Sequence, residues 1–406
     1  MGRNAALGLD IDFAHSTFQW SNDAPGIAAV HCVIVGFGAQ SARSKQLWSY
    51  ADMKAHSVGA KVVQINPYLV EAPIVLIQKR RGPICVVPEI IFGSKATDGG
   101  NLLLSDQEKT ELLASEPRAA PWIRPFLGAD EFINGVTLWC LWLEKCPPTE
   151  LAKLKLVKTR IEAVRTMSLA STKEPTQELA LTPALFGENR QIAVDYLLIP
   201  RVSSERRQYV PIGCLSANTV CADAKFMLPN AQLFHFAILC THMHMAWMRY
   251  VCGRLKSDFR YSNTIVYNNF PWPNIVNHIV TSLLQLVSNV PLAQSIRAYA
   301  APETIAFNET DATTAKLIAK IEAAAHAVLD ARALHQTGLP PGAAPSTLAQ
   351  LYDPTTMPAN LAKAHAALDK AIDTAYTEDG GAASYAKDGK RVAFLFKRYA
   401  ALTSLV

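Results

Sequence analysis

Two β-strand patterns near the start of the chain constrain the fold most strongly. Leu9, Ile11 and Phe13 alternate with polar or small residues, as in a strand with one buried face. Residues 28–37 are apolar at almost every position, which is typical of a central strand covered on both faces. Since two strands do not make a stable domain, we expect residues 9–37 to be neighbouring strands of a larger sheet. Their partners must lie later in the chain or in a part that this sequence lacks.

The composition fits a protein of two or three domains. The 406 residues are long for one domain, and a content of 50% hydrophobic and 18% charged residues allows a sizeable core. The formal net charge of +5 is compatible with a nucleic-acid partner without requiring one.

Targeting signals and cysteine usage both indicate the cytoplasm. The N-terminus lacks the basic and then apolar layout of a signal peptide. The eight cysteines contain no C-x-x-C pair and therefore predict reduced thiols. The long apolar stretch at 231–252 includes Gln232, Arg249 and three histidines, too polar for a bilayer, and predicts one buried helix. We expect a soluble, cytoplasmic protein without a membrane partner.

The rest of the chain divides near residues 66 and 273. Between 61 and 91 the runs VVQI, PIVLIQ and PICVVPEII predict short strands, and Ser105 with Glu108 forms a capping box that begins a helix. From 274 onward the pattern is helical, with two sets of residues that each share one helix face. The sets are Leu317, Ile321, Ala324 and Val328, and Leu361, His365, Leu368, Ile372 and Tyr376.

The glycines of Gly36-Phe37-Gly38 follow a strand pattern, as in the cofactor loop of a methyltransferase or dehydrogenase. However, the motif has no third glycine, and Asp52, at about the expected distance, does not end a strand. The pattern favours a plain buried strand.

The tripeptide Asn66-Pro67-Tyr68 is close to the Asn/Asp-Pro-Pro-aromatic motif with which amino-methyltransferases hold a flipped base. Tyr68 stands where that motif has its second proline, so the pattern favours a strand end closed by Asn-Pro. A complete small methyltransferase that uses Gly36, Gly38 and Asn66 stays open as an alternative.

Three basic segments combine cations with hydroxyl, amide and aromatic groups: residues 153–165, 201–209 and 249–262. Phosphate contacts need this mixture, although solvated surface loops have the same composition. His242 and His244 are two positions apart on the predicted helix and point to different faces, so we expect no metal site there. We expect no catalytic, cofactor-binding or metal-binding residues in this chain.

The wording of several segments indicates a family. In order along the chain, FAHSTFQWSN, GSKATDGGNLLLS, VSSERRQYVPIG, MHMAWMR, GRLKSDFRYSNTIVYNNFPWP and LYDPTTMP resemble the C-terminal half of MmeI-like enzymes. These are type IIL restriction-modification proteins, related to class I SAM-dependent, adenine-specific DNA methyltransferases. The resemblance runs from about residue 9 to the C-terminus.

The resemblance implies a mixed α+β architecture in three parts. Residues 1–66 would be the incomplete edge of an α/β methyltransferase sheet, 67–273 a mixed α/β target recognition domain, and 274–406 a helical C-terminal domain. The family's SAM loop and Asn-Pro-Pro-aromatic motif would lie upstream of Met1. The chain would then be a fragment, a truncated product or the partner of an upstream catalytic polypeptide. It would be inactive alone, while the full-length enzyme would use S-adenosyl-L-methionine.

The resemblance also implies which residues meet double-stranded DNA. The expected contacts lie in two segments: Arg201, Ser203, Ser204, Arg206, Arg207 and Tyr209, and Lys256, Arg260, Tyr261 and Ser262. We expect these residues to position phosphates, and bases to be read by less stereotyped residues within 214–230. Phe18 and Trp20 are candidates for the wall of a base pocket, although a sheet core would use such aromatics equally well.

Three functions follow, from different classes. The favoured one is sequence-specific DNA recognition for an adenine-N6 methyltransferase of a restriction-modification system. The alternatives are the complete small methyltransferase and a non-catalytic interaction scaffold whose basic loops are merely solvated.

Overall fold

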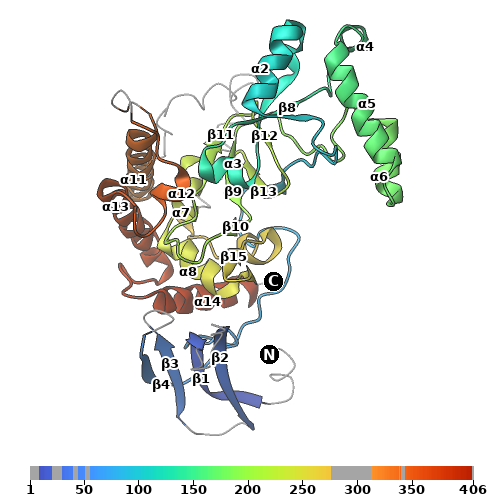
Figure 1. Cartoon of the computed structure of the whole chain (residues 1–406). Coiled ribbons are helices and arrows are strands. Elements are labelled where there is room, and N and C mark those ends of the chain that lie inside the picture. The colour runs from blue at the N-terminus through green and yellow to red at the C-terminus, as the bar shows by residue number, and fades with distance from the viewer. Residues whose placement is uncertain are drawn as a thin grey trace.

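The computed structural model describes residues 9–20, 30–39, 44–50, 55–275, 312–337, 339 and 343–404 (Figure 1). A small sheet near the N-terminus, drawn in blue, lies at one end of the molecule. A mixed part in cyan to yellow follows, and helices in orange to red pack beside it. The mixed α and β fold predicted from the sequence is confirmed. Asp52 lies outside the described residues, as does most of 274–311.

The N-terminal sheet has four strands in the order β2-β1-β3-β4. They are β1 (Leu9–Trp20), β2 (Val30–Ala39), β3 (Lys45–Tyr50) and β4 (Ser57–Val62). Strand β1 pairs antiparallel with β2 and parallel with β3. The two neighbouring strands expected within 9–37 are therefore confirmed. The central position expected for 28–37 is wrong, because β2 is an edge strand and much of it is exposed.

The two faces of this sheet differ. On one face Ile11 and Ala14 are buried against Val62, Ile65 and Leu69, which together form a small core. The opposite face carries the aromatic rings of five residues of β1 and β3, namely Phe13, His15, Phe18, Trp48 and Tyr50. His15 stacks on Trp48, and Phe18 stacks on Tyr50 at a centroid distance of 5.1 Å. Phe13 on this face is 41% exposed, and β2 contains only exposed and half-buried residues, so the apolar pattern of β2 does not coincide with burial.

Neither enzyme-like motif forms a ligand loop. Gly36 and Gly38 lie inside β2, and a side chain at Gly36 would overlap the ring of Phe13 on the neighbouring strand. The side-chain oxygen of Asn66 accepts hydrogen bonds from the backbone N–H groups of Tyr68 (3.0 Å) and Val70 (3.2 Å). Both motifs therefore have structural roles. Gly36 and Gly38 lie in a strand, as expected, but the strand is an exposed edge and not a buried one, and Asn66 begins a turn four residues after β4 ends.

The middle part contains two four-stranded sheets and several helices. One sheet has the order β11-β9-β13-β5 and the other β12-β7-β8-β6. The strands are β5 (Ile91–Phe92), β6 (Leu103–Leu104), β7 (Ile123–Leu127), β8 (Leu138–Leu141), β9 (Tyr196–Pro200), β11 (Gly213–Leu215), β12 (Val220–Cys221) and β13 (Lys225–Pro229). The helices are α2 (Asp106–Ser115), η1 (Pro117–Trp122), α3 (Ala129–Asn134), α4 (Pro148–Leu151), α5 (Lys155–Leu169), α6 (Glu174–Glu178) and η2 (Leu179–Leu181).

In this part the structure confirms one prediction made from the sequence and contradicts others. The predicted capping box is present, since Ser105 and Glu108 exchange hydrogen bonds at the start of α2. The strands expected in PIVLIQ and PICVVPEII are wrong apart from Ile91. Residues 73–90 contain no strand, and three prolines interrupt the hydrogen-bonding pattern that a strand would need. The basic segment 153–165 is largely the helix α5, in which Arg160 pairs with Glu108 at 2.6 Å.

The single buried helix expected at 231–252 is two helices. They are α7 (Leu233–Leu239) and α8 (His242–Val251). Thr241 has an extended backbone between them, and its hydroxyl donates to the carbonyl of Ile238 at 2.7 Å. A hydroxyl that bonds to a preceding carbonyl competes with helix continuation, which explains the break.

The C-terminal helices share one hydrophobic core with the middle part. They are α11 (Ala312–Gln336), α12 (Leu348–Leu351), α13 (Ala359–Ala375), η6 (Thr377–Asp379) and α14 (Asp388–Ser404). Helix α11 packs on α7 and α13, and α14 packs on α8. All five residues predicted to share a face between 361 and 376 are buried. The face predicted on α11 is shifted slightly, because Ile318 and Ala325 are buried where Leu317 and Ala324 are only half-buried.

Lys225 is a charged residue inside this core. It lies in β13, is 2% exposed, and forms no ion pair within the described part of the chain. Burial lowers the pKa of its ammonium to about 8. The unfolded chain would hold this proton up to a pKa of about 10.4. The charged form therefore destabilises the fold at neutral pH.

We predict that Lys225→Met raises the free energy of unfolding at pH 7 by about 2 kcal/mol. Since the folded protein releases the proton near pH 8 and the unfolded chain near 10.4, wild-type stability rises across this window. The difference in free energy of unfolding between Lys225→Met and the wild type should therefore become smaller as the pH rises. Urea unfolding followed by circular dichroism at pH 7 and pH 9.5 measures both differences. An advantage that is absent at pH 7, or unchanged at pH 9.5, would contradict the prediction.

Candidate nucleic-acid interface

A small three-stranded sheet brings together two of the three basic segments. Its order is β10-β15-β14, with β10 (Val202–Ser203), β14 (Gly253–Leu255) and β15 (Asp258–Arg260). Val202 pairs with Arg260, and the N–H of Tyr261 donates to the carbonyl of Arg201 at 2.8 Å. Residues 201–207 and 253–262 therefore lie side by side although about 50 positions separate them.

The hairpin of β14 and β15, which we call the ribbon, presents one exposed face. Leu255 and Arg260 are exposed on it, while Phe259 is buried on the other side. Lys256 forms the turn with a positive φ of 55° and is exposed. Arg254 stacks over the ring of Phe259 at 4.0 Å, which joins the two strands from behind. The ribbon thus holds Lys256 at its tip and Arg260 on its outer face, while Arg254 lies on the opposite face against Phe259.

The loop after β10 adds further cations. The hydroxyl of Ser204 accepts from the N–H of Arg206 at 3.3 Å, which forms a local turn. The side chain of Arg206 is 62% exposed and lies 3.8 Å from Asp353 of the C-terminal part. Glu205 lies 3.8 Å from Arg254 and links the loop to the ribbon. Arg206 therefore has a weak, solvent-screened partner that an anion could replace.

Several of the expected DNA contacts point inward instead. The hydroxyl of Tyr209 donates to Asp369 at 2.7 Å, and that of Tyr261 lies 3.0 Å from Nε2 of His244. Burial raises the pKa of both tyrosines. Ser203 is buried, and Ser262 caps the π-helix η3 (Asn263–Tyr267). The side chains of these four residues are therefore internal supports.

The arginines of this region divide in the same way. Arg201 donates to the carbonyl of Asp223 at 2.9 Å and lies against the rings of Phe92 and Phe226. Arg207 is half-buried, and burial lowers the pKa of its guanidinium. Of the ten expected residues, three side chains are clearly exposed: Arg206, Lys256 and Arg260.

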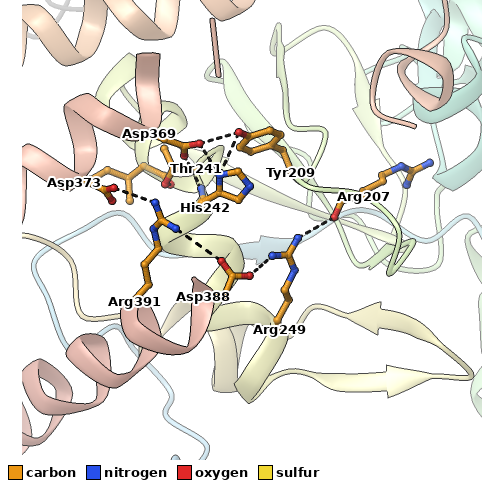
Figure 2. Close-up of polar contacts among 10 residues, drawn as sticks. Arg207, Tyr209, Thr241, His242, Arg249, Asp369, Asp373, Asp388 and Arg391 are labelled. Atoms are coloured by element: carbon orange, nitrogen blue, oxygen red, sulfur yellow. Dashed lines mark hydrogen bonds and ion pairs between the residues drawn. The ribbon is translucent and has the colours of Figure 1, made fainter. Parts of the chain in front are cut away.

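A polar network fastens the region to the C-terminal helices (Figure 2). Asp369 of α13 accepts from the backbone N–H of His242 (2.7 Å) and from the Tyr209 hydroxyl, and its carboxylate lies 2.6 Å from Nδ1 of His242. Arg249 of α8 pairs with Asp388 of α14 and also donates to the carbonyl of Arg207 at 3.3 Å. The C-terminal part therefore positions both ends of the segment 207–209.

A second buried chain of contacts lies behind the first. Arg332 of α11 donates to the carbonyl of Ile212 at 2.6 Å and to the hydroxyl of Tyr352. That hydroxyl lies 2.9 Å from Nε2 of His365, whose ring stacks on Tyr209 at 4.0 Å. Burial lowers the pKa of His365 to about 3, so the ring is neutral at physiological pH. His242 and His244 bind different partners, which confirms that they point to different faces.

A further basic segment, Lys79-Arg80-Arg81, lies beside the end of β15. The N–H of Arg80 donates to the carbonyl of Thr264 at 3.0 Å, just after Ser262. This segment is not among the three basic segments predicted from the sequence. Its three adjacent cations could have indicated an anion-binding site, but they directly follow PIVLIQ, which was predicted to be a strand.

The two base-pocket candidates lie on the N-terminal sheet, away from the ribbon (Figure 1). Phe18 belongs to the aromatic face, and Trp20, at the end of β1, is 52% exposed. Within the described ranges, no group of three or more His, Cys, Asp or Glu residues is placed to hold a metal ion. No helix in the described part of the chain is both long and apolar enough to cross a membrane.

Comparisons with known proteins match successive parts of the chain to one family. Residues 4–49 match the DNA-methyltransferase domain of MmeI, 71–274 its target recognition domain, and 313–406 its C-terminal domain. DNA methyltransferase A of Bacillus subtilis (strain 168) is 32% identical over 397 residues, which cover 98% of this chain and 39% of that protein.

A solved structure matches nearly the whole chain. The type IIL restriction-modification enzyme MmeI, in complex with DNA, is 38% identical with a TM-score of 0.75. The match covers 99% of this chain and 47% of that enzyme. The chain therefore spans less than half the length of these two relatives.

We predict that Asp369→Ala lowers the free energy of unfolding by about 3 kcal/mol, because removing one partner leaves buried polar groups unpaired. Asp330→Ala, which removes an exposed carboxylate from α11, serves as the matched control and should change stability by less than about 0.5 kcal/mol. Urea unfolding measures both. Equal effects of the two substitutions would show that the Asp369 contacts do not hold the helices in place.

Proposed function

The chain belongs to the MmeI family, and from this we propose that it provides sequence-specific DNA recognition for an adenine-N6 methyltransferase of a restriction-modification system. The target-recognition match covers the ribbon and the loop 203–207. One observation carries the proposal: two basic segments distant in sequence join on one small sheet and present exposed cations. The related MmeI structure is a complex with DNA, which supports double-stranded DNA as the partner.

The geometry of the ribbon suits a DNA groove. The major groove admits a two-stranded β-ribbon, and an arginine or lysine at its outer face can reach guanine O6 and N7. Lys256 at the tip and Arg260 on the exposed face are placed for such contacts. Arg206, on the neighbouring loop, is placed for a backbone phosphate, with Ser204 shaping its turn.

We assign base reading to the ribbon rather than to residues 214–230. Val220 to Ala222 are buried in or beside β12, and Lys225 is buried in β13. Asn218 and Ala224 are exposed, but they flank buried strands. The ribbon is the more accessible element, because its tip and outer face carry no covering segment among the described residues.

The internal residues have supporting roles in this proposal. Tyr209 and Tyr261 anchor the two segments to Asp369 and His244, and Arg201 braces the sheet from behind. Preorganised elements lose less conformational entropy on binding. Ser262 caps η3, the carbonyl of Arg207 accepts from Arg249, and Ser203 is buried in β10.

The three residues that could have served methyl transfer in this chain have structural roles instead. Gly36 and Gly38 are inside a strand, and Asn66 is committed to a turn, so these residues do not fit S-adenosyl-L-methionine or a flipped base. We propose that an upstream catalytic polypeptide binds the cofactor and packs on the aromatic face of the N-terminal sheet. Phe18 and Trp20 would lie at that contact, where they could wall the base pocket.

The proposed setting is the cytoplasm. All eight cysteines are free thiols, as expected in a reducing compartment. A restriction-modification partner would also meet its DNA there.

The first test is fluorescence anisotropy of a labelled duplex titrated with the chain at several salt concentrations. Log K should fall with log salt by about 0.9 for each neutralised phosphate. Lys256→Ala/Arg260→Ala should weaken binding about tenfold or more and should change which sequences are preferred. The scaffold alternative predicts no salt-dependent binding.

A control variant removes the same charge elsewhere. Lys316→Ala/Lys320→Ala changes two exposed lysines of α11, a C-terminal helix outside the basic segments of the proposed interface. This variant should bind like the wild type. If it weakens binding as much as the ribbon variant, net charge rather than the ribbon explains the affinity, and the proposed interface is wrong.

A further inference from the structure

We propose that Lys79, Arg80 and Arg81 form a second phosphate-binding element for the sugar-phosphate backbone of duplex DNA, next to the ribbon. The inference rests on the proposed DNA-recognition function and extends it to a segment outside the expected contacts. Its residues lie in the connection between β4 and β5, which contains no helix or strand from 63 to 90.

Two asparagine side chains hold the backbone of this basic segment. The Nδ2 group of Asn268 donates to the carbonyls of Arg80 (2.9 Å) and Arg81 (3.0 Å). Nδ2 of Asn269 donates to the carbonyl of Gln78 at 3.0 Å. Both asparagines are almost fully buried, with exposures of 3% and 0%. The carbonyls of three of the four residues 78–81 are therefore fixed from the protein side.

The clamp is itself anchored in the core. Asn269 also donates to the carbonyls of Thr264 and Ile265, and its side-chain oxygen accepts from the hydroxyl of Tyr399 at 3.3 Å. The N–H of Ile84 donates to the carbonyl of Asn268 at 2.8 Å. A segment without secondary structure is thus tied to the core by side-chain hydrogen bonds.

The cations of the segment are left without internal partners. Lys79 and Arg81 are exposed and Arg80 is half-buried, and none of the three forms an ion pair with a carboxylate among the described residues. Three adjacent like charges repel one another, and fixing their backbone prevents them from separating. An arrangement that is unfavourable alone becomes favourable when a polyanion lies across it.

The segment also has a fixed position relative to the ribbon. Thr264, whose carbonyl accepts from Arg80, follows β15 by four residues, and Ser262 between them caps η3. Figure 1 shows the blue connection passing beside the yellow helix that follows β15. The ribbon and the basic segment therefore share one anchor, residues 262–269, and would engage the same duplex together.

Phosphates suit this segment better than bases. The backbone that carries these cations is hydrogen-bonded directly to buried asparagines of the core. Contacts to bases need an element that projects into a DNA groove. Contacts to phosphates add affinity and salt dependence without sequence preference.

The test is Lys79→Ala/Arg81→Ala in the full chain, measured by anisotropy on two duplexes of unrelated sequence at four salt concentrations. We expect the slope of log K against log salt to become shallower by about 1.8, and the affinity near 0.1 M salt to fall at least about tenfold. Both duplexes should be affected equally, because phosphates are common to all sequences. The charge-preserving Lys79→Arg/Arg81→Lys variant should retain the wild-type slope.

The outcomes separate this inference from the function on which it rests. If the wild type shows no salt-dependent DNA binding, both fail. If the wild type binds but Lys79→Ala/Arg81→Ala keeps its slope and affinity, this inference alone is overturned. It is also overturned if the α11 control, Lys316→Ala/Lys320→Ala, loses as much affinity, since a general loss of positive charge would then suffice.

Discussion

The carboxylate of Asp369 is the contact on which the arrangement of the molecule most depends. Asp369 belongs to the C-terminal helix α13. Its carboxylate accepts hydrogen bonds from the hydroxyl of Tyr209 and from the backbone N–H of His242, the first residue of α8. A buried carboxylate is tolerated only when it is well paired, so these elements must stay together. The consequence is that the C-terminal helices, the ribbon and the loop after β10 form one body with a common core.

The N-terminal sheet is stabilised separately from the rest of the molecule, by a small core of its own. It has a small core on one face and aromatic rings on the other, with its edge strand largely exposed. Exposed apolar faces of this kind mark surfaces that another element covers. Its match to a methyltransferase domain spans residues 4–49. In the proposed function, this sheet would connect the rest of the chain to a catalytic part, and the ribbon with its neighbouring loop would select the DNA.

Local patterns predicted part of the local structure, and tertiary contacts decided which side chains of the site face inward. The alternation in residues 9–13 and the Ser105 capping box depend on neighbours in sequence, and both predictions were confirmed. The break at Thr241 comes from a hydroxyl bond to the nearby carbonyl of Ile238, and three prolines keep residues 73–90 from forming a strand. Both causes are local, but hydrophobic periodicity does not record them. In the site, the mixture of cations with hydroxyl and aromatic groups made both basic segments recognisable, but the sequence could not show that Tyr209 and Tyr261 face inward. Their partners lie on other elements.

We propose that the ribbon, the loop after β10 and the basic segment Lys79-Arg80-Arg81 together bind one DNA duplex. Hydrogen–deuterium exchange of the full chain with and without duplex DNA tests this most directly, because it reports where backbone amides become protected. We expect DNA to slow the exchange of backbone amides at residues 78–84, 202–207 and 253–262, and to leave the exchange on the exposed side of α11 unchanged. Protection confined to the N-terminal sheet or to α11, with no change in those three segments, would contradict it.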